Sequence, residues 1–250
     1  MLRSIREITG YAIKASDGDI GRCHDFLFDD HSWVIRYMVA TTAKWLSRRK
    51  VIISLVFFEQ PDWVEKRFPV SLTRKQIENS PPLEEHAPVS RQYEIAYHEH
   101  YAVPFYWAGN ELWGAYPDPA GVVHPLPEQT SPTARDINID DGHLRSTNEF
   151  QNYRIMARDG NAGHIDDFLV DDITWALRYL VVDTRNWLPG RKVLISPEWV
   201  ESVSWANEKV YVDLNSDMIK DSPEYDPNQP VNRQYEITLY DYYGRPHYWK

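Results

Sequence analysis

Short runs of alternating apolar and polar residues recur along the chain, a pattern typical of β-strands with one buried face. In the first part of the chain we assign strands to residues 11–15, 20–28, 34–41, 51–55 and 64–70. In the third run Ile35, Tyr37 and Val39 alternate to one face, which places Arg36 on the other. Short strands at this spacing predict a small barrel or a strongly coiled sheet.

Turn residues separate these runs. Asp17-Gly18 tolerates positive φ and predicts a hairpin, and Gly21 early in the next strand indicates a bulge or a close backbone approach. A short helix is expected over residues 73–79 and again over 216–221, because a Ser-Pro pair follows each segment.

The whole pattern occurs twice. Asp17-Gly18, Trp33 and Ser54 correspond to Asp159-Gly160, Trp175 and Ser196, and 159 minus 17 and 196 minus 54 both give an offset of 142. Residues 1–107 and 143–249 align without a gap, which is the signature of an internal duplication. We therefore predict repeat 1 over residues 1–107, a linker over 108–142 and repeat 2 over 143–250.

Prolines and acidic residues fill the segment between the copies, residues 108–142. Because proline removes backbone donors and favours extended neighbours, we predict a solvated tether with little regular structure, with a functional loop as the alternative.

The end of each copy, residues 91–107 and 233–249, is rich in aromatic residues. Its first half predicts a helical turn or two, which Pro104 and Pro246 end. The aromatic side chains that both copies keep at the end of this tail are Tyr106, Trp107, Tyr248 and Trp249. Such a cluster is too apolar to lie free in water, so we expect each tail to pack on a barrel. The barrel of the other copy and that of a second chain are the candidates.

The formal net charge is −10 and 16 Tyr and 10 Trp are present. The acidic balance makes nucleic acid an unlikely general partner. Cys23 is the only cysteine, which excludes an intramolecular disulfide, and its counterpart Ile165 indicates a buried thiol. The chain has no signal-peptide pattern and no run of about 18 apolar residues, so we expect a soluble cytoplasmic protein.

No catalytic motif is found. The sequence lacks a nucleophile elbow, a phosphate-binding loop and a His-Glu-x-x-His pair, and no histidine of the first copy recurs in the second. His98-Glu99-His100 is interpreted as a surface feature and not as a metal site. We predict no catalytic residues, no cofactor and no enzymatic activity.

Acidic residues are the remaining candidates for a site. Asp25 recurs as Asp167, and the weak candidates for cation ligands are Asp29, Asp30, Asp171 and Asp172. Oxygen-rich clusters suit a hard cation such as calcium, but a turn that requires Asp at its first positions explains the same residues.

Several basic and aromatic positions also recur. Arg36 and Arg178 are expected to pair with carboxylates of their own barrel. Arg49-Lys50 and Arg191-Lys192 are interpreted as solvated pairs that could seat an acidic partner. Trp45 and Trp187 are candidates for an interaction surface or for packing against the barrel.

The residues around Asp17-Gly18, Asp25-Phe26-Leu27 and Trp33-Val34-Ile35-Arg36-Tyr37 resemble the PRC-barrel domain, the fold of the cytoplasmic part of the photosynthetic reaction centre H subunit and of half of a ribosome-maturation factor. The resemblance covers residues 5–80 and 147–222. It implies a mainly β protein of two tandem PRC-type barrels, each with a short helix and an aromatic C-terminal extension.

The same resemblance implies a docking or assembly module, usually without catalytic residues. We therefore expect a protein-interaction role with an unidentified protein partner or with a second copy. The alternatives are small-molecule or cation binding between the barrels, a reaction-centre-like accessory role, or ribosome association, which the acidic charge disfavours.

Overall fold

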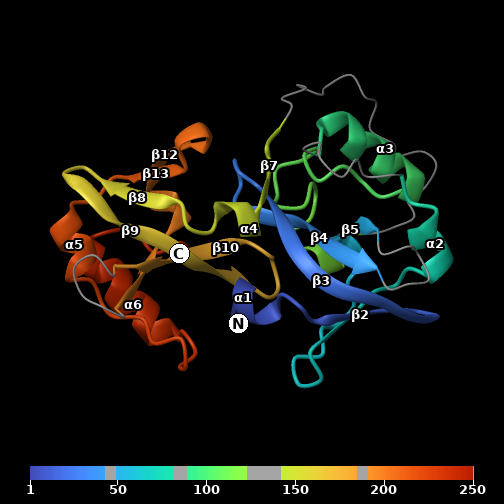
Figure 1. Cartoon of the computed structure of the whole chain (residues 1–250), viewed down its shortest axis with the longest axis horizontal. Helices are drawn as coiled ribbons and strands as arrows, with labels where there is room; N and C mark the ends of the chain where they lie inside the picture. The colour runs from blue at the N-terminus through green and yellow to red at the C-terminus, as the bar shows by residue number, and fades with distance from the viewer. Residues whose placement is uncertain (43–48, 82–88, 123–141, 185–190, 250) are drawn as a thin grey trace. The chain divides into compact units, whose positions relative to one another are not determined.

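The computed structural model describes residues 1–42, 49–81, 89–122, 142–184 and 191–249 and shows a mainly β protein (Figure 1). The chain divides into two compact units. The repeat 1 unit comprises Glu7–Asn148 and Ile173–Ala176, and the repeat 2 unit comprises Met1–Arg6, Glu149–Asp172 and Leu177–Lys250. Each unit therefore contains a short piece of the other repeat.

The sheet of the repeat 1 unit has the strand order β5-β4-β3-β2-β6, and β7 pairs with β3 beside this path. The strands are β2 (Ala12–Ala15), β3 (Gly18–Asp29), β4 (Val34–Thr42), β5 (Lys50–Ser54), β6 (Arg67–Pro69) and β7 (Leu144–Ser146). The pairing of β2 with β6 is parallel and the others are antiparallel, so the sheet is mixed.

The sheet of the repeat 2 unit has the order β11-β10-β9-β8-β13-β12, and β1 pairs with β9. Its strands are β1 (Leu2–Ser4), β8 (Arg154–Ala157), β9 (Gly160–Asp171), β10 (Leu177–Asp183), β11 (Lys192–Ile195), β12 (Val200–Ser204) and β13 (Lys209–Val212). The parallel pair β8–β13 matches β2–β6. In both sheets the described pairings form an open path.

Most predicted strands are confirmed, and one is shorter than predicted. The run 64–70 forms a strand only over Arg67–Pro69, because Asp62 Oδ1 accepts the backbone N–H groups of Val64 and Glu65 and closes a turn there. Gly21 fulfils its predicted role, since a Cβ atom at this position would lie 2.0 Å from the carbonyl oxygen of Thr41.

Helices cover the sheets at the predicted places. α2 (Arg74–Glu78) begins with a capping box between Thr73 and Gln76, and α5 (Ser216–Lys220) is its counterpart. The predicted helical turns of the tails are longer helices, α3 (Arg91–Tyr101) and α6 (Arg233–Tyr243). The remaining short elements are α1 (Ile5–Ile8), α4 (Thr147–Phe150), η2 (Leu55–Phe57), η3 (Pro119–Gly121), η5 (Pro197–Trp199) and η6 (Trp205–Asn207).

The tail helices α3 and α6 pack on the sheet of their own repeat, so the expectation that they pack on the other copy is wrong. Packing on a second chain stays a prediction. The Tyr97 hydroxyl of α3 accepts the backbone N–H of Ser54 at the end of β5. In the other unit the Tyr240 hydroxyl of α6 donates to Ser196 Oγ. The strands β1 and β7 cross between the repeats, and so does the short segment Ile173–Ala176.

The prediction of a solvated tether is wrong for Trp113. This side chain is 2 % exposed, and its Nε1 donates to the carbonyl oxygen of Thr174 at 2.9 Å. The expectation fails because the prolines of this segment do not prevent a single large aromatic side chain from being buried. Residues 123–141 of the predicted linker lie outside the described residues.

Among the described residues, none of the helices has the length and apolar character needed to cross a membrane. Cys23 is buried as predicted, and burial raises the pKa of its thiol.

Candidate functional site

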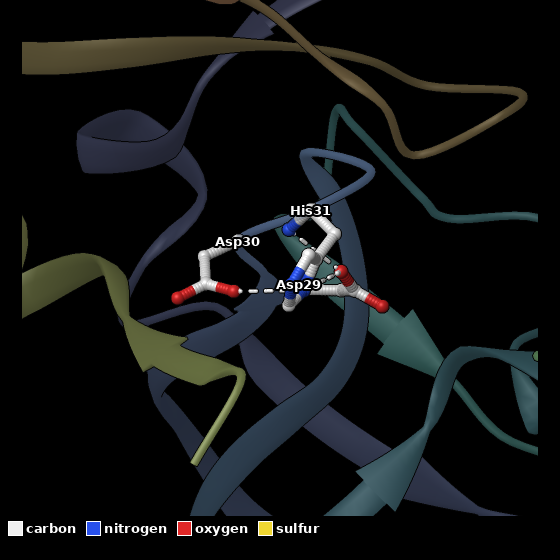
Figure 2. A group of neighbouring side chains, drawn as sticks. All are labelled: Asp29, Asp30 and His31. Carbon is white, nitrogen blue, oxygen red and sulfur yellow. Dashed lines mark hydrogen bonds and ion pairs between the residues drawn. The ribbon is translucent and has the colours of Figure 1, made fainter. Parts of the chain in front are cut away.

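Asp29, Asp30 and His31 lie together in the turn that follows β3 (Figure 2). One ligand atom from each lies within 4.8 Å of the others. Asp29 Oδ1 already accepts the backbone N–H groups of His31 at 2.9 Å and Ser32 at 3.1 Å, so this carboxylate closes the turn as predicted.

Arginine side chains compensate the two carboxylates. Arg145 Nε donates to Asp30 Oδ2 at 2.8 Å, and Arg36 Nη2 lies 3.9 Å from Asp29 Oδ2. In the second copy Arg3 Nε donates to Asp172 Oδ2 at 3.2 Å, and Ile173 stands where the first copy has His31. The second copy therefore lacks the third ligand, and cation binding at Asp171 and Asp172 stays a prediction.

Asp25 binds the segment that the other repeat contributes. Its Oδ2 accepts the hydroxyl of Ser146 at 2.5 Å, and its Oδ1 accepts the hydroxyl of Thr147 at 2.8 Å and the backbone N–H of Asn148 at 3.1 Å. The backbone N–H of Phe26 also donates to Oδ1, at 2.7 Å. A single buried carboxylate thus satisfies four donors, three of which lie on or next to β7.

Asp167 does the same in the repeat 2 unit. Its Oδ2 accepts the hydroxyl of Ser4 at 2.5 Å, and its Oδ1 accepts the backbone N–H groups of Arg6 at 3.0 Å and Phe168 at 2.8 Å. Burial raises the pKa of the Asp167 carboxyl, although these donors act in the opposite direction. We call residues 2–6 and 144–148 the exchange segments, because each is bound by the other repeat.

A second polar cluster is buried beneath α3. Glu94 is fully buried, and its Oε1 accepts the hydroxyls of Tyr106 at 2.7 Å and Tyr37 at 3.1 Å. Its Oε2 lies 3.1 Å from both Arg91 Nη1 and His143 Nε2. Two cationic or polar side chains therefore face the charge that helix α3 carries into the interior.

His98 extends this cluster. Its Nε2 lies 2.9 Å from the hydroxyl of Tyr37 and its Nδ1 lies 2.8 Å from the carbonyl oxygen of Pro104. Burial lowers the pKa of His98 to about 4, and burial with the neighbouring Glu94 raises the pKa of Tyr37 well above its ordinary value. At neutral pH the imidazole is neutral and the phenol keeps its proton, so this pair forms hydrogen bonds and carries no charge.

The repeat 2 unit has a reduced version of the cluster. Glu236 Oε1 accepts the hydroxyls of Tyr179 and Tyr248, both at 2.9 Å, and Arg233 Nη1 lies 3.1 Å from Oε2. Tyr240 stands where repeat 1 has His98. The shared carboxylate and its two phenols therefore hold a tail helix against β4 or β10. The histidines His98 and His143 are an addition of the repeat 1 unit, to which repeat 2 contributes His143.

Histidines His98 and His143 are residues that the sequence analysis did not assign to a site. The signal in the sequence lies in the residues that contact these histidines, because Glu94 recurs as Glu236 and Tyr106 recurs as Tyr248. Polar residues that are identical in both copies of a duplication, and that lie in segments expected to pack, indicate a buried hydrogen-bond network. His98, interpreted as a surface residue, is 2 % exposed, so that interpretation is wrong.

The predicted interaction residues of the tails contact their own unit. Tyr106 and Tyr248 donate to the buried carboxylates described above. The guanidinium of Arg91 lies 4.0 Å from the ring of Trp107, and that of Arg233 lies 4.0 Å from the ring of Trp249. Trp45 and Trp187 lie outside the described residues, so their role stays a prediction.

Three of the four basic residues interpreted as solvated, Arg49, Arg191 and Lys192, have partners, whereas Lys50 is exposed as expected. Arg49 Nη2 donates to the carbonyl oxygen of Glu78 at the end of α2, and Arg191 Nη2 donates to that of Ser222 after α5. Cations at helix C-termini complement the helix dipole, so the two arginines are caps. Lys192 Nζ donates to Asp166 at 2.6 Å.

The prediction that Arg36 pairs with a carboxylate is confirmed only in part. It lies 3.9 Å from Asp29, but its shorter contacts are Nη1 to the carbonyl oxygen of Leu112 at 2.5 Å and the guanidinium over the Tyr106 ring at 4.0 Å. Arg178 lies 4.4 Å from the ring of Tyr248. The arginines of β4 and β10 thus pack against the aromatic tails.

No family model matches this sequence, and no curated protein matches it. The PRC-barrel resemblance and the assembly role that it implies stay predictions.

Proposed function

We propose that the chain is a non-catalytic assembly module built from two PRC-type barrels, which binds another protein. One observation carries the proposal: each sheet is completed by a strand that its own repeat does not supply. β7 pairs with β3 and β1 pairs with β9, both antiparallel. Addition of an outside strand to a sheet is a common mode of peptide recognition.

The chemistry of the buried carboxylates also supports a binding role. Asp25 and Glu94 each accept hydrogen bonds from several fixed donors, so their oxygens hold segments in place. A general base needs a free oxygen or nitrogen within reach of a substrate proton. These carboxylates are engaged in positioning the exchange segment and helix α3.

A capture experiment tests the proposal. The tagged full chain is incubated with lysate of its own cells at moderate salt, and bound proteins are identified by mass spectrometry. We expect a stoichiometric partner that is lost with the Trp45→Ala, Trp187→Ala double variant and kept with a Val64→Ala control, a change at a side chain that is 88 % exposed. Absence of any stoichiometric partner would contradict the proposal.

Cation binding is the second candidate function, because Asp29 and Asp30 place carboxylate oxygens, the ligands that calcium and magnesium prefer, close together and next to His31. Titration with calcium or magnesium, followed by tryptophan fluorescence, would show a saturable change if the turn binds the ion. Trp33 lies in the same turn and would report it. A flat response at millimolar ion, equal to that of Asp30→Asn, would end this candidate.

A further inference from the structure

The two exchange segments are identical over their first three residues and differ in the next two, Ile5-Arg6 and Thr147-Asn148. Both begin with Leu-Arg-Ser, as Leu2–Ser4 and Leu144–Ser146. Both pair antiparallel with the same stretch of the longest strand, so that Leu2 lies opposite Asp171 and Leu144 lies opposite Asp29. The segments therefore present the same backbone and the same first three side chains to their docking sites.

We call the surfaces that bind the segments the docking sites: β3 with Asp25 and Asp30 in one unit, and β9 with Asp167 and Asp172 in the other. The two docking sites bind the arginine and the serine of a segment through the same contacts. The arginine donates to the second aspartate of the turn, as Arg3 to Asp172 and Arg145 to Asp30. The serine donates to the buried aspartate at 2.5 Å in both units, as Ser4 to Asp167 and Ser146 to Asp25. Nothing in these contacts distinguishes one segment from the other.

The connection between a segment and the rest of its repeat is short. The boundary between the units falls between Arg6 and Glu7, inside the single turn of α1, and again between Asn148 and Glu149, inside α4. A short hinge favours exchange, because it directs the segment away from the sheet of its own repeat.

We propose that each docking site also accepts an exchange segment from a second copy of this chain, so that two copies assemble by exchanging Leu-Arg-Ser segments. This inference rests on the proposed function as an assembly module and names a second copy as one partner. Within one chain the tethered segment has an effective concentration of about 1 mM. Exchange between two chains therefore competes with pairing inside one chain when the protein concentration approaches this effective concentration.

Variants that each add one cysteine to the buried Cys23 test the proposal in the full chain. Leu2→Cys and Asp171→Cys change a facing pair and leave the contacts of Ser4 with Asp167 intact. Residues that face each other in an antiparallel pair lie within disulfide distance. The two variants are mixed, unfolded in urea, refolded together at about 0.1 mM and oxidised. We expect about a tenth of the chains to form a covalent dimer linked through positions 2 and 171.

Matched controls separate exchange from random collision. Leu144→Cys with Asp29→Cys tests the second docking site and should give the same yield. Leu2→Cys mixed with Val64→Cys, an exposed position outside the strands, gives the background. A dimer yield at this background in both facing mixtures would overturn the proposal, while a partner captured from lysate would still support the proposed function.

Discussion

The hydroxyl of Ser146 lies 2.5 Å from Oδ2 of Asp25, although 121 residues separate the two along the chain. Ser4 makes the same contact with Asp167 across 163 residues. The duplicated chain thus uses one pair of residue types twice to bind a strand of one repeat to the sheet of the other. The stability of both units should depend on these two carboxylates.

Asp25→Ala should lower the free energy of unfolding by about 3 kcal/mol, because it removes the acceptor of several buried donors. Asp25→Asn keeps one carbonyl oxygen and should cost less. Chemical denaturation of the two variants measures the difference, and Asp19→Ala, at an exposed position of the same strand, is the control. Equal stability of Asp25→Ala and the control would contradict the role of Asp25.

Tyr106→Phe should destabilise the protein by about 2 kcal/mol, since the lost hydroxyl lies 2.7 Å from Glu94 and 2.9 Å from His143. Tyr248→Phe should cost about 1 kcal/mol, because Tyr248 is half-buried and its hydroxyl donates to Glu236. Thermal unfolding of both variants checks the order. A smaller loss for Tyr106→Phe than for Tyr248→Phe would show that the buried cluster of repeat 1 is not the tighter one.

The titration of His98 should lower the stability of the folded protein at acidic pH. Its pKa is about 4 in the folded protein, below the ordinary value of 6.5, because burial disfavours the charged imidazole. The unfolded chain therefore takes up a proton first as the pH falls. The contribution of His98 to the free energy of unfolding is constant above pH 6.5. It is lost progressively between pH 6.5 and pH 4, by about 3 kcal/mol in all.

His98→Gln provides the comparison, because it removes the titrating group while the carboxylates titrate in both proteins. The difference in unfolding free energy between wild type and variant should shrink or reverse as the pH falls from 7 to 4 in urea titrations. A difference that is constant over this range would mean that the pKa of His98 is the same in the folded and the unfolded protein, and would contradict the lowering of its pKa by burial.

Gly21→Ala should cost about 3 kcal/mol, because the new Cβ atom would lie 2.0 Å from the carbonyl oxygen of Thr41 and the strands would have to separate. Gly121→Ala is the matched control, since its nearest contact would be an ordinary 3.5 Å from a Tyr116 side-chain atom, and should change stability by about 0.5 kcal/mol or less. Similar losses for both variants would show that β3 and β4 are not this close at Gly21.

Local features could be predicted from the sequence because their causes are local. The Asp17-Gly18 turn, the tight glycine at position 21 and the helix capped by Thr73 depend on neighbouring residues, and all are found. The length of α3 was underestimated, because Ser90 caps its first turn and Ala102 ends it in a left-handed conformation just before Val103. Serine is a common N-cap residue, but alanine does not typically end a helix in the left-handed conformation, so the end of α3 could not be predicted.

The exchange of segments could not be predicted from the sequence. Since Leu2–Ser4 and Leu144–Ser146 are identical, pairing with the own repeat and pairing with the other repeat place the same side chains against the same aspartates. Local propensity and hydrophobic pattern are equal for the two arrangements. Only the path of the chain through α1 and α4 distinguishes them.

The most direct test of the exchanged arrangement compares two double-cysteine variants of the full chain at micromolar concentration, where association between chains is negligible. One carries Leu2→Cys with Asp171→Cys, the pair that faces across the repeats, and the other carries Leu2→Cys with Asp29→Cys, the pair that would face within repeat 1. Mass spectrometry after mild oxidation should find an intrachain disulfide in the first variant and free thiols at both positions in the second. A disulfide only in the second variant would contradict the exchange and show that each repeat binds its own segment.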